Sequence, residues 1–201
     1  MKKKWVDIVS KVDFAFQPIV NVHSGICFGV EALIRGVSDA CFDSIGAFFD
    51  EAYYENALFP MDMLLRRKAI EKFCTINSHP NLKLFYNIDN RVTCMPDYIP
   101  GTSAEMIKAK GLPESSICYE ISEKHEFNAS IEIKQILDSY RLQGYKIAVD
   151  DFGSGFSGLQ ILYHVEPDYI KIDRFFITDI QKDSRKKLFV STVLNLAHIL
   201  G

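Results

Sequence analysis

The 201-residue sequence lacks several features that would assign it to a specialised class of protein. Its five scattered cysteines form no C-x-x-C pair, which argues against a disulfide framework or a zinc site and favours reduced thiols in a cytoplasmic protein. No segment approaches the roughly 18 apolar residues of a membrane span, so we expect no membrane segment. A formal net charge of −3 leaves no basic excess for binding polymeric nucleic acid. We therefore expect one globular domain around a single core.

Segments rich in β-formers alternate with segments of helical periodicity along the chain. The predicted strands are residues 14–20, 26–35, 82–89, 116–122, 147–149 and 169–172. The predicted helices are one capped by Ser44, one capped by Asp62, one that starts at Thr102 or Ser103, residues 129–142 with Gly144 as their stop, residues 157–163 and residues 186–200. This alternation is typical of parallel strands joined by helical crossovers, and it fits both a doubly wound sheet and a (β/α) barrel.

Polar side chains fall at the C-terminal ends of five successive predicted strands. They are Glu31, Asn87 with Asp89, Glu120 with Glu123, Asp150 with Asp151, and Lys171 with Asp173. In a (β/α) barrel the C-terminal ends of all strands meet at the active-site face, whereas the outer strands of a flat sheet lie too far apart to share a site. The pattern therefore favours a barrel with one active site.

Two adjacent aspartates, Asp150 and Asp151, end an apolar strand and precede a glycine-rich loop. The loop residues are Phe152, Gly153, Ser154 and Gly155. Adjacent anions repel each other and resist desolvation, so a divalent cation is the simplest way to hold them together. The glycines allow the backbone to approach a ligand closely or to form a lid.

Oxygen ligands dominate these strand ends, with neither histidine nor cysteine among them. Such ligands suit Mg²⁺ or Mn²⁺ better than zinc. Two ions about 3.5–4 Å apart stabilise both the attacking and the leaving oxygen in phosphoryl transfer. Lys171 would orient the water and offset charge on the non-bridging oxygens. The residues alone therefore predict metal-dependent phosphodiester hydrolysis.

Six motifs, in order and spacing, resemble those of the EAL domain family of bacterial cyclic di-GMP phosphodiesterases. The motifs are QPI at 17–19, EALIR at 31–35, NID at 87–89, EISE at 120–123, DDFGSGFS at 150–157 and KID at 171–173. The resemblance implies an α/β fold, namely a modified (β/α)8 TIM-like barrel whose first strand runs antiparallel to the others. It also implies an N-terminal lead-in at residues 1–13, a domain at residues 14–201, and hydrolysis of cyclic di-GMP to linear pGpG.

The resemblance further implies a set of metal ligands for Mg²⁺ or Mn²⁺. The residues that would bind the first ion are Glu31, Asn87, Glu120 and Asp150. Asp150 would bridge the two ions, and Asp151 would bind the second.

The other matching residues would act on the substrate or on the loop. Lys171 would contact the water nucleophile or the scissile phosphate, and Asp173 would lie beside the second ion. Glu123 would hold the loop of residues 151–159 in its productive position. The residues that would contact cyclic di-GMP are Gln17, Leu33 and Arg35.

Two departures from the family pattern accompany the resemblance. Asp89 stands where the family commonly has serine. A (β/α)8 barrel usually needs about 250 residues, and the last two strands of the family, with a catalytic-site glutamate and a substrate-binding glutamine, are missing. We therefore expect a fragment of a longer protein, or an oligomer that covers the gap, and little or no hydrolysis by these 201 residues alone. The alternative is a non-catalytic module that binds cyclic di-GMP or a protein. A homodimer is compatible with the resemblance.

Overall fold

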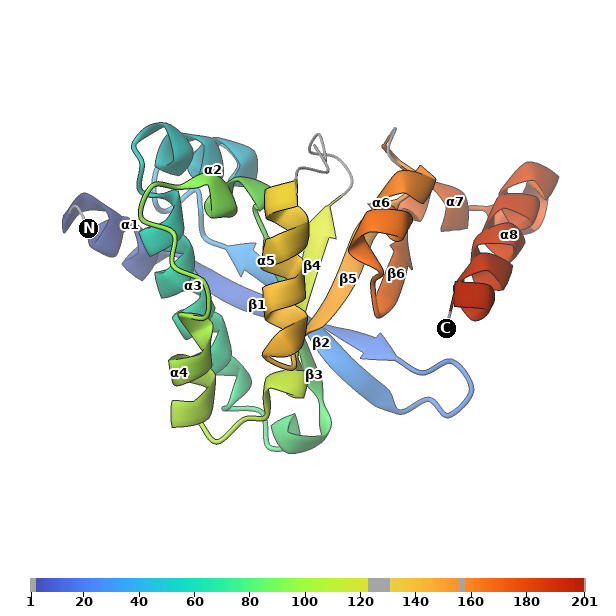
Figure 1. Ribbon diagram of the computed structural model, residues 1–201, viewed down its shortest axis with the longest axis horizontal. Helices are drawn as coiled ribbons and strands as arrows, with labels where there is room; N and C mark the ends of the chain where they lie inside the picture. The colour runs from blue at the N-terminus through green and yellow to red at the C-terminus, as the bar shows by residue number, and fades with distance from the viewer. Residues whose placement is uncertain (1–2, 123–130, 156–157, 201) are drawn as a thin grey trace.

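The fold is built on one sheet, in which strands that follow one another along the chain also lie side by side (Figure 1). The computed structural model describes residues 3–122, 131–155 and 158–200. The strands within these ranges are β1 (Asp13–Val20), β2 (Cys27–Arg35), β3 (Lys83–Ile88), β4 (Ile117–Ser122), β5 (Lys146–Phe152) and β6 (Tyr169–Ile172). β1 runs antiparallel to β2, and every later pair of neighbours is parallel. The six predicted strands and the antiparallel first strand are therefore confirmed.

Helices connect the parallel strands (Figure 1). The α-helices of the described residues are α1 (Lys3–Lys11), α2 (Ile45–Tyr54), α3 (Leu58–Phe73), α4 (Ser103–Ala109), α5 (Ile131–Leu142), α6 (Gly158–Val165), α7 (Arg174–Ile177) and α8 (Ser184–Leu200). The 3-10 helices are η1 (His79–Asn81), η2 (Asn90–Cys94), η3 (Glu114–Ser116) and η4 (Ile180–Lys182). Each of the six predicted helices has a counterpart, although residues 129, 130 and 157 lie outside the described residues. α1 and α7 were not predicted.

Local sequence explains where two of these helices begin or end. The Ser44 hydroxyl accepts a hydrogen bond from the Ala47 backbone N–H at 3.0 Å, which confirms it as the cap of α2. Gly144 follows α5 with a φ of +95°, a left-handed conformation that favours glycine. The predicted stop of α5 is therefore confirmed as well.

The predicted cap of α3 is wrong. Asp62 lies inside this helix, which begins at Leu58 after Ala57, and its side chain is fully buried. Arg66, one turn further along, pairs with Asp62 at 2.5 Å between Nε and Oδ2. An aspartate near a helix start reads as a cap in the sequence, but here the buried arginine provides its partner instead.

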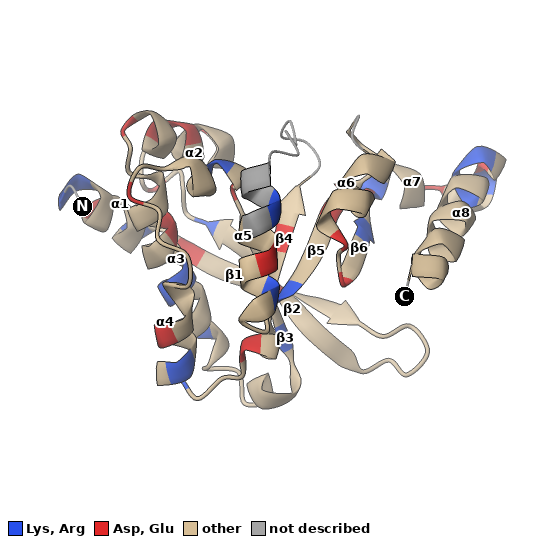
Figure 2. Ribbon diagram, in the orientation of Figure 1, with Lys and Arg blue, Asp and Glu red and all other residues tan. Residues whose placement is uncertain are grey.

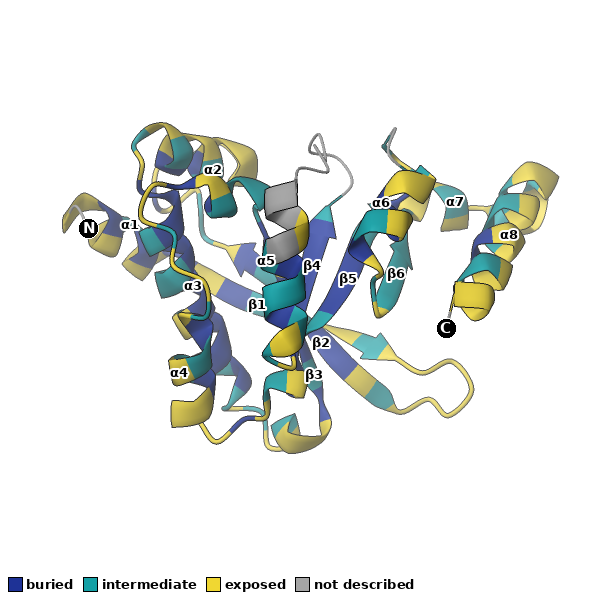
Figure 3. Cartoon of the chain, viewed as in Figure 1, coloured by how far each residue is buried: buried dark blue, intermediate teal, exposed yellow. Residues whose placement is uncertain are grey.

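The two faces of the sheet bury different sets of residues, because successive side chains of a strand point to opposite sides. The larger core lies between the sheet and the helices, on what we call the outer face (Figure 3). The opposite, inner face carries a separate small cluster of Phe85, Cys118 and Ala148, against which Ile19 and Tyr169 pack. Side chains that follow two residues later on β3 to β6 therefore pack next to this inner cluster.

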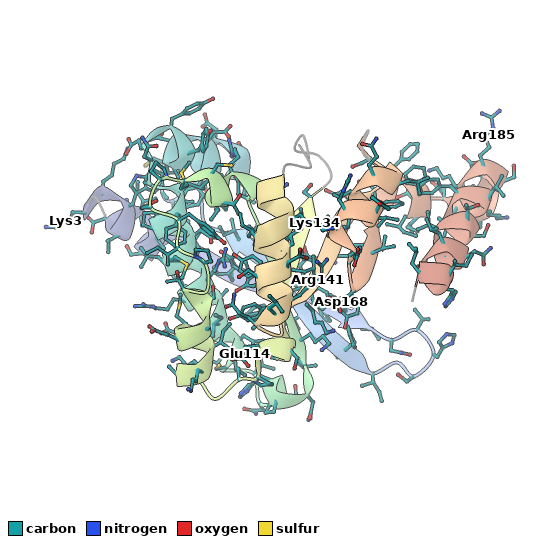
Figure 4. All side chains as sticks on the ribbon, in the orientation of Figure 1. Lys3, Glu114, Lys134, Arg141, Asp168 and Arg185 are labelled. Carbon is teal, nitrogen blue, oxygen red and sulfur yellow. The ribbon has the colours of Figure 1, made fainter. Side chains whose placement is uncertain are left out.

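Asp168, which precedes β6, binds the beginning of β5 (Figure 4). One carboxylate oxygen accepts the Ile147 backbone N–H at 2.9 Å, and the other binds the Lys146 ammonium at 2.6 Å. The Asp168 backbone N–H also donates to the Ile147 carbonyl at 2.8 Å. Because β6 has only four residues, this attachment sets the position of Lys171 on it.

No α-helix among residues 3–122, 131–155 and 158–200 combines the length and the apolar character needed to cross a membrane.

The first helix belongs to the core. Trp5 and Val9 of α1 are buried, and the indole ring of Trp5 packs against Phe42 and Phe48 at centroid distances of 6.3 and 6.0 Å. The Trp5 indole N–H donates to Glu55 at 3.1 Å. α1 thus contributes to folding, while the boundary expected after residue 13 stays a prediction.

Replacement of Trp5 by alanine is expected to destabilise the protein by about 3–5 kcal/mol, because it leaves a large cavity under α1. Urea denaturation followed by far-UV circular dichroism measures the loss. Val6→Ala, at an exposed position of the same helix, is the matched control and should change the free energy of unfolding by less than about 0.5 kcal/mol. Equal effects of the two substitutions would contradict a core role for α1.

Candidate metal centre

Strand register gathers polar side chains on the inner face, directly beyond the inner cluster. Two residues past Phe85, Cys118, Ala148 and Tyr169 come, in the same order, Asn87, Glu120, Asp150 and Lys171. Asn87 and Glu120 are register partners across β3 and β4, and Glu31 of β2 pairs with Phe85. Since residues two apart on a strand share a face, all five polar side chains project from the inner face.

Three carboxylates and one ammonium group meet at this point. Glu31, Glu120 and Asp150 each offer an oxygen atom, and these atoms lie within 4.8 Å of one another. The Lys171 Nζ lies 2.9 Å from Glu31, 2.6 Å from Glu120 and 3.1 Å from Asp150. Four strands therefore converge on a single cluster of charges.

The Asn87 amide joins two of the carboxylates. Its Nδ2 donates to Glu31 Oε1 at 3.2 Å and to Glu120 Oε2 at 3.0 Å. Asn87, predicted as a metal ligand from its place at a strand end, thus lies in direct contact with the predicted carboxylate ligands.

Burial changes the acid–base properties of the cluster. Glu120 is fully buried, and this burial raises the pKa of its carboxyl to about 8, although the Lys171 charge acts in the opposite direction. Burial also opposes the charge on Lys171, but Glu120 and Asp150 together raise the pKa of Lys171 well above its ordinary value. Lys171 therefore stays protonated at any physiological pH.

The donor set fits a divalent cation. Once an ion had displaced the proton of Glu120, three ionised carboxylates would face one ammonium and give the cluster a net charge of about −2. Carboxylate and amide oxygens are the ligands that Mg²⁺, Mn²⁺ and Ca²⁺ accept. Because Asn87 Nδ2 faces the carboxylates, its amide would have to turn for the oxygen Oδ1 to serve as a ligand.

Asp151 and Asp173, predicted for a second ion, do not belong to the carboxylate cluster found among the described residues. Asp151 has a φ of +53°, at the irregular end of the β5–β6 pairing. The Asp173 carboxylate accepts the Phe175 backbone N–H at 2.7 Å and so caps α7. A second ion at these residues stays a prediction.

The loop after Asp151 is closely packed at Gly153. Phe152 is buried and ends β5, and Ser154 donates its backbone N–H to the Asp151 carbonyl at 3.1 Å. Gly153 has a φ of +95°, and a Cβ atom there would lie 2.6 Å from Phe176 and 2.7 Å from Phe189. Glycine is thus required both by the backbone conformation and by lack of space.

Phe176 of α7 and Phe189 of α8, stacked at 3.8 Å, were not among the predicted site residues. Their contact with Gly153 spans more than 20 residues of sequence, so no local pattern indicates it. Gly155 was predicted as part of the same loop and lies at the end of a described range.

The predicted substrate-binding residues continue along the same face of β1 and β2. Gln17 is the register partner of Glu31, and Leu33 and Arg35 follow Glu31 at steps of two. Gln17 and Arg35 are exposed, and Arg35 donates to its neighbour Ile34 at 2.8 Å. The register therefore places all three residues on the side of the sheet that carries the metal centre.

The structure differs from the sequence-based expectation at two positions, and a third position is not described. Glu31 lies in the middle of β2 and not at its end, because this strand continues to Arg35 opposite β1. Asp89 accepts the Arg91 backbone N–H at 2.9 Å and caps η2, away from the cluster. Glu123, predicted to position the loop, lies outside the described residues.

Comparison with known proteins identifies the family. The sequence profile of the EAL domain matches residues 9–201. The chain belongs to the EAL domain family. The predicted family and the TIM-like α/β fold with an antiparallel first strand are therefore confirmed.

Two curated relatives show how much of a longer protein this EAL domain chain spans. It is 28% identical over 190 residues to PdeG of Escherichia coli, which is named a probable cyclic di-GMP phosphodiesterase. The aligned region covers 92% of this chain and 37% of PdeG. It is 33% identical over 177 residues to YkuI of Bacillus subtilis, an uncharacterised EAL-domain-containing protein. That aligned region covers 84% of this chain and 42% of YkuI. The EAL domain chain thus spans less than half the length of these relatives.

A solved EAL structure supports the same family assignment. BlrP1 of Klebsiella pneumoniae, in a complex with calcium and cyclic di-GMP, superimposes on this chain with a TM-score of 0.83 at 26% identity. The superposition covers 95% of this chain and 47% of BlrP1. Its manganese and cyclic di-GMP complex gives a TM-score of 0.79 over the same shares.

The free energy of unfolding of the metal-free protein is expected to decrease as the pH rises from 5 to 8. In this range the folded state keeps a proton on Glu120 that the unfolded state has lost near the ordinary pKa of 4.5. Where only the folded form holds this proton, the slope approaches about 1.4 kcal/mol per pH unit. Urea denaturation at several pH values, with chelator present, measures it. Glu120→Gln should flatten the profile, and a variant that keeps the wild-type slope would show that another group causes it.

Proposed function

We propose that this EAL domain takes part in metal-dependent hydrolysis of cyclic di-GMP to linear pGpG. The observation that carries the proposal is the convergence of Glu31, Glu120, Asp150, Asn87 and Lys171 on the inner face. A cluster with a net negative charge and oxygen donors provides a place for a divalent cation.

Glu31, Asn87, Glu120 and Asp150 would hold a first Mg²⁺ or Mn²⁺ ion, with Asp150 also facing a second ion held by Asp151. When bound, such ions lower the pKa of water and stabilise negative charge on phosphoryl oxygens. The protein contributes the spacing of the donors, which the register of β2 to β5 sets before any ion arrives.

Lys171 serves as a fixed positive charge in this proposal. Its raised pKa excludes it as a general base near neutral pH, since it gives up its proton only in strong alkali. Its ammonium group is therefore suited to orient the attacking water or to offset charge on a non-bridging phosphate oxygen. Its place between three carboxylates positions it beside any ion that they bind.

The substrate would extend from the metal centre along β1 and β2. Gln17, Leu33 and Arg35 share the inner face with Glu31, and the exposed Arg35 has a cation that suits phosphate. Asp173 would act beside the second ion, and Glu123 would position the loop that contains Gly153 and Ser154. Figure 2 shows acidic and basic residues interspersed over the ribbon, which favours a small ligand over polymeric nucleic acid.

Relatives add support from outside the chain. PdeG carries the name of a cyclic di-GMP phosphodiesterase, and BlrP1 has been solved with cyclic di-GMP together with calcium or manganese. The second candidate function is a non-catalytic module that binds cyclic di-GMP or a protein. A cytoplasmic location and a homodimer belong to the proposal.

The test is hydrolysis of cyclic di-GMP by the complete gene product with Mn²⁺ or Mg²⁺, followed by chromatographic detection of pGpG. Chelator should abolish turnover, and Glu31→Ala should lower it by at least about 100-fold, since it removes a carboxylate ligand. Glu71→Ala, at a carboxylate that pairs with Lys110 elsewhere on the protein, is the matched control and should stay active.

Unchanged turnover in Glu31→Ala would contradict the metal-site assignment. Binding of cyclic di-GMP by calorimetry, without pGpG formation under any metal, would favour the non-catalytic module.

A further inference from the structure

A buried polar network lies on the outer face of the sheet, directly behind the metal centre. Tyr86 and Tyr119 immediately precede Asn87 and Glu120, and each pair is matched in register across β3 and β4. Because side chains alternate, the two tyrosines point to the opposite side from the two predicted ligands. Any interaction that fixes the tyrosines therefore also fixes the backbone that carries the ligands.

Asp62 and Arg66 of α3 provide that interaction. The Tyr86 hydroxyl donates to Asp62 Oδ1 at 3.0 Å, while Arg66 Nε binds Asp62 Oδ2 at 2.5 Å. The Arg66 guanidinium also lies over the ring of Tyr119, 4.9 Å from its centroid. One ion pair on a single helix thus contacts both strands at the level of Asn87 and Glu120.

The same ion pair is held from the helical side. Arg66 Nη1 donates to the Ser103 hydroxyl of α4 at 3.0 Å and lies 3.4 Å from the Tyr140 hydroxyl of α5. Asp62, Arg66 and Ser103 are all at least 98% buried. The network therefore links three helices to two neighbouring strands in the protein interior.

Stability alone does not account for a charge pair in this place. Replacing a buried ion pair by apolar residues of similar volume is often neutral or stabilising, because both charges must be desolvated. Hydrogen bonds and ion pairs have defined lengths and directions, whereas apolar packing tolerates small shifts. What the pair adds is a fixed position for β3 relative to β4.

We propose that Asp62 and Arg66 are positioning residues for the metal centre. By holding Tyr86 and Tyr119 they fix the parts of β3 and β4 that carry Asn87 and Glu120, whose side chains are joined by the 3.0 Å hydrogen bond from Nδ2 to Oε2. The inference rests on the proposed metal site, but it concerns residues of α3 that neither touch an ion nor face the substrate.

The test compares variants that keep the protein folded. Asp62→Leu combined with Arg66→Met removes both charges at once, so no unpaired charge stays buried. Tyr86→Phe removes only the hydroxyl bonded to Asp62. Tyr98→Phe is the matched control, since the Tyr98 hydroxyl donates to Tyr140 at 3.4 Å, on the helical side of the network, and Tyr98 lies on no strand.

Two measurements separate positioning from stability. Calorimetric titration with Mn²⁺ should show affinity lowered on the order of tenfold in the double variant and less in Tyr86→Phe, as is common when groups supporting ligands are removed. In metal-free protein, NMR should show the side-chain amide resonances of Asn87 shifted in the same variants, because the bond from Nδ2 to Glu120 changes. Tyr98→Phe should alter neither.

Each outcome decides one of the two proposals. Wild-type affinity and unshifted Asn87 resonances in folded Asp62→Leu/Arg66→Met protein would overturn the positioning role. If the double variant does not fold, the same two results in Tyr86→Phe overturn it. Failure of the unaltered protein to bind Mn²⁺ would overturn the proposed function, and the Asn87 resonances would still decide whether α3 positions the strands.

Discussion

The crowding of the carboxyl groups of Glu31, Glu120 and Asp150 at one point is the constraint on which the rest of this structure depends. Carboxyl groups whose oxygens lie within 4.8 Å of one another cannot all ionise without a cation between them, and the ammonium of Lys171 lies within 3.1 Å of all three. Lys171 stands on the short strand β6, so this charge balance requires β6 to stay attached to β5. The contacts of Asp168 at the beginning of β6 therefore help to keep the Lys171 charge in place, although Asp168 does not touch the centre.

The inner and outer faces of the sheet divide the work of building this centre. The inner face holds apolar side chains at one level and charged ones at the next, so the carboxylates rest on Phe85, Cys118 and Ala148 and lose water on that side. Loss of water explains why the fully buried Glu120 holds its proton more tightly than an exposed glutamate. The outer face carries the Asp62–Arg66 pair, a second set of buried charges that lies behind β3 and β4.

The elements of the fold and the members of the cluster could be predicted from local patterns, because strand periodicity and strand-end chemistry lie within a few residues. The polar positions Asn87, Glu120 and Asp150 are examples, and they converge as expected. Partners distant in sequence could not be predicted. The local pattern predicts a helix cap at Asp62, because its burial depends on Tyr86 of a distant strand, and the contact of Gly153 with Phe176 depends on how α7 packs. Short sequence windows carry side-chain periodicity but no register between distant segments.

Helix α1, which contains Trp5, lies at the opposite end of the molecule from α8 (Figure 1). It is the single tryptophan of the sequence and has no exposed surface, with its N–H bonded to Glu55. Fluorescence excited selectively in tryptophan, apart from the nine tyrosines, is therefore a one-site signal from a residue of α1 that packs against Phe48 of α2. Tryptophan emission would therefore report whether α1 is packed against α2.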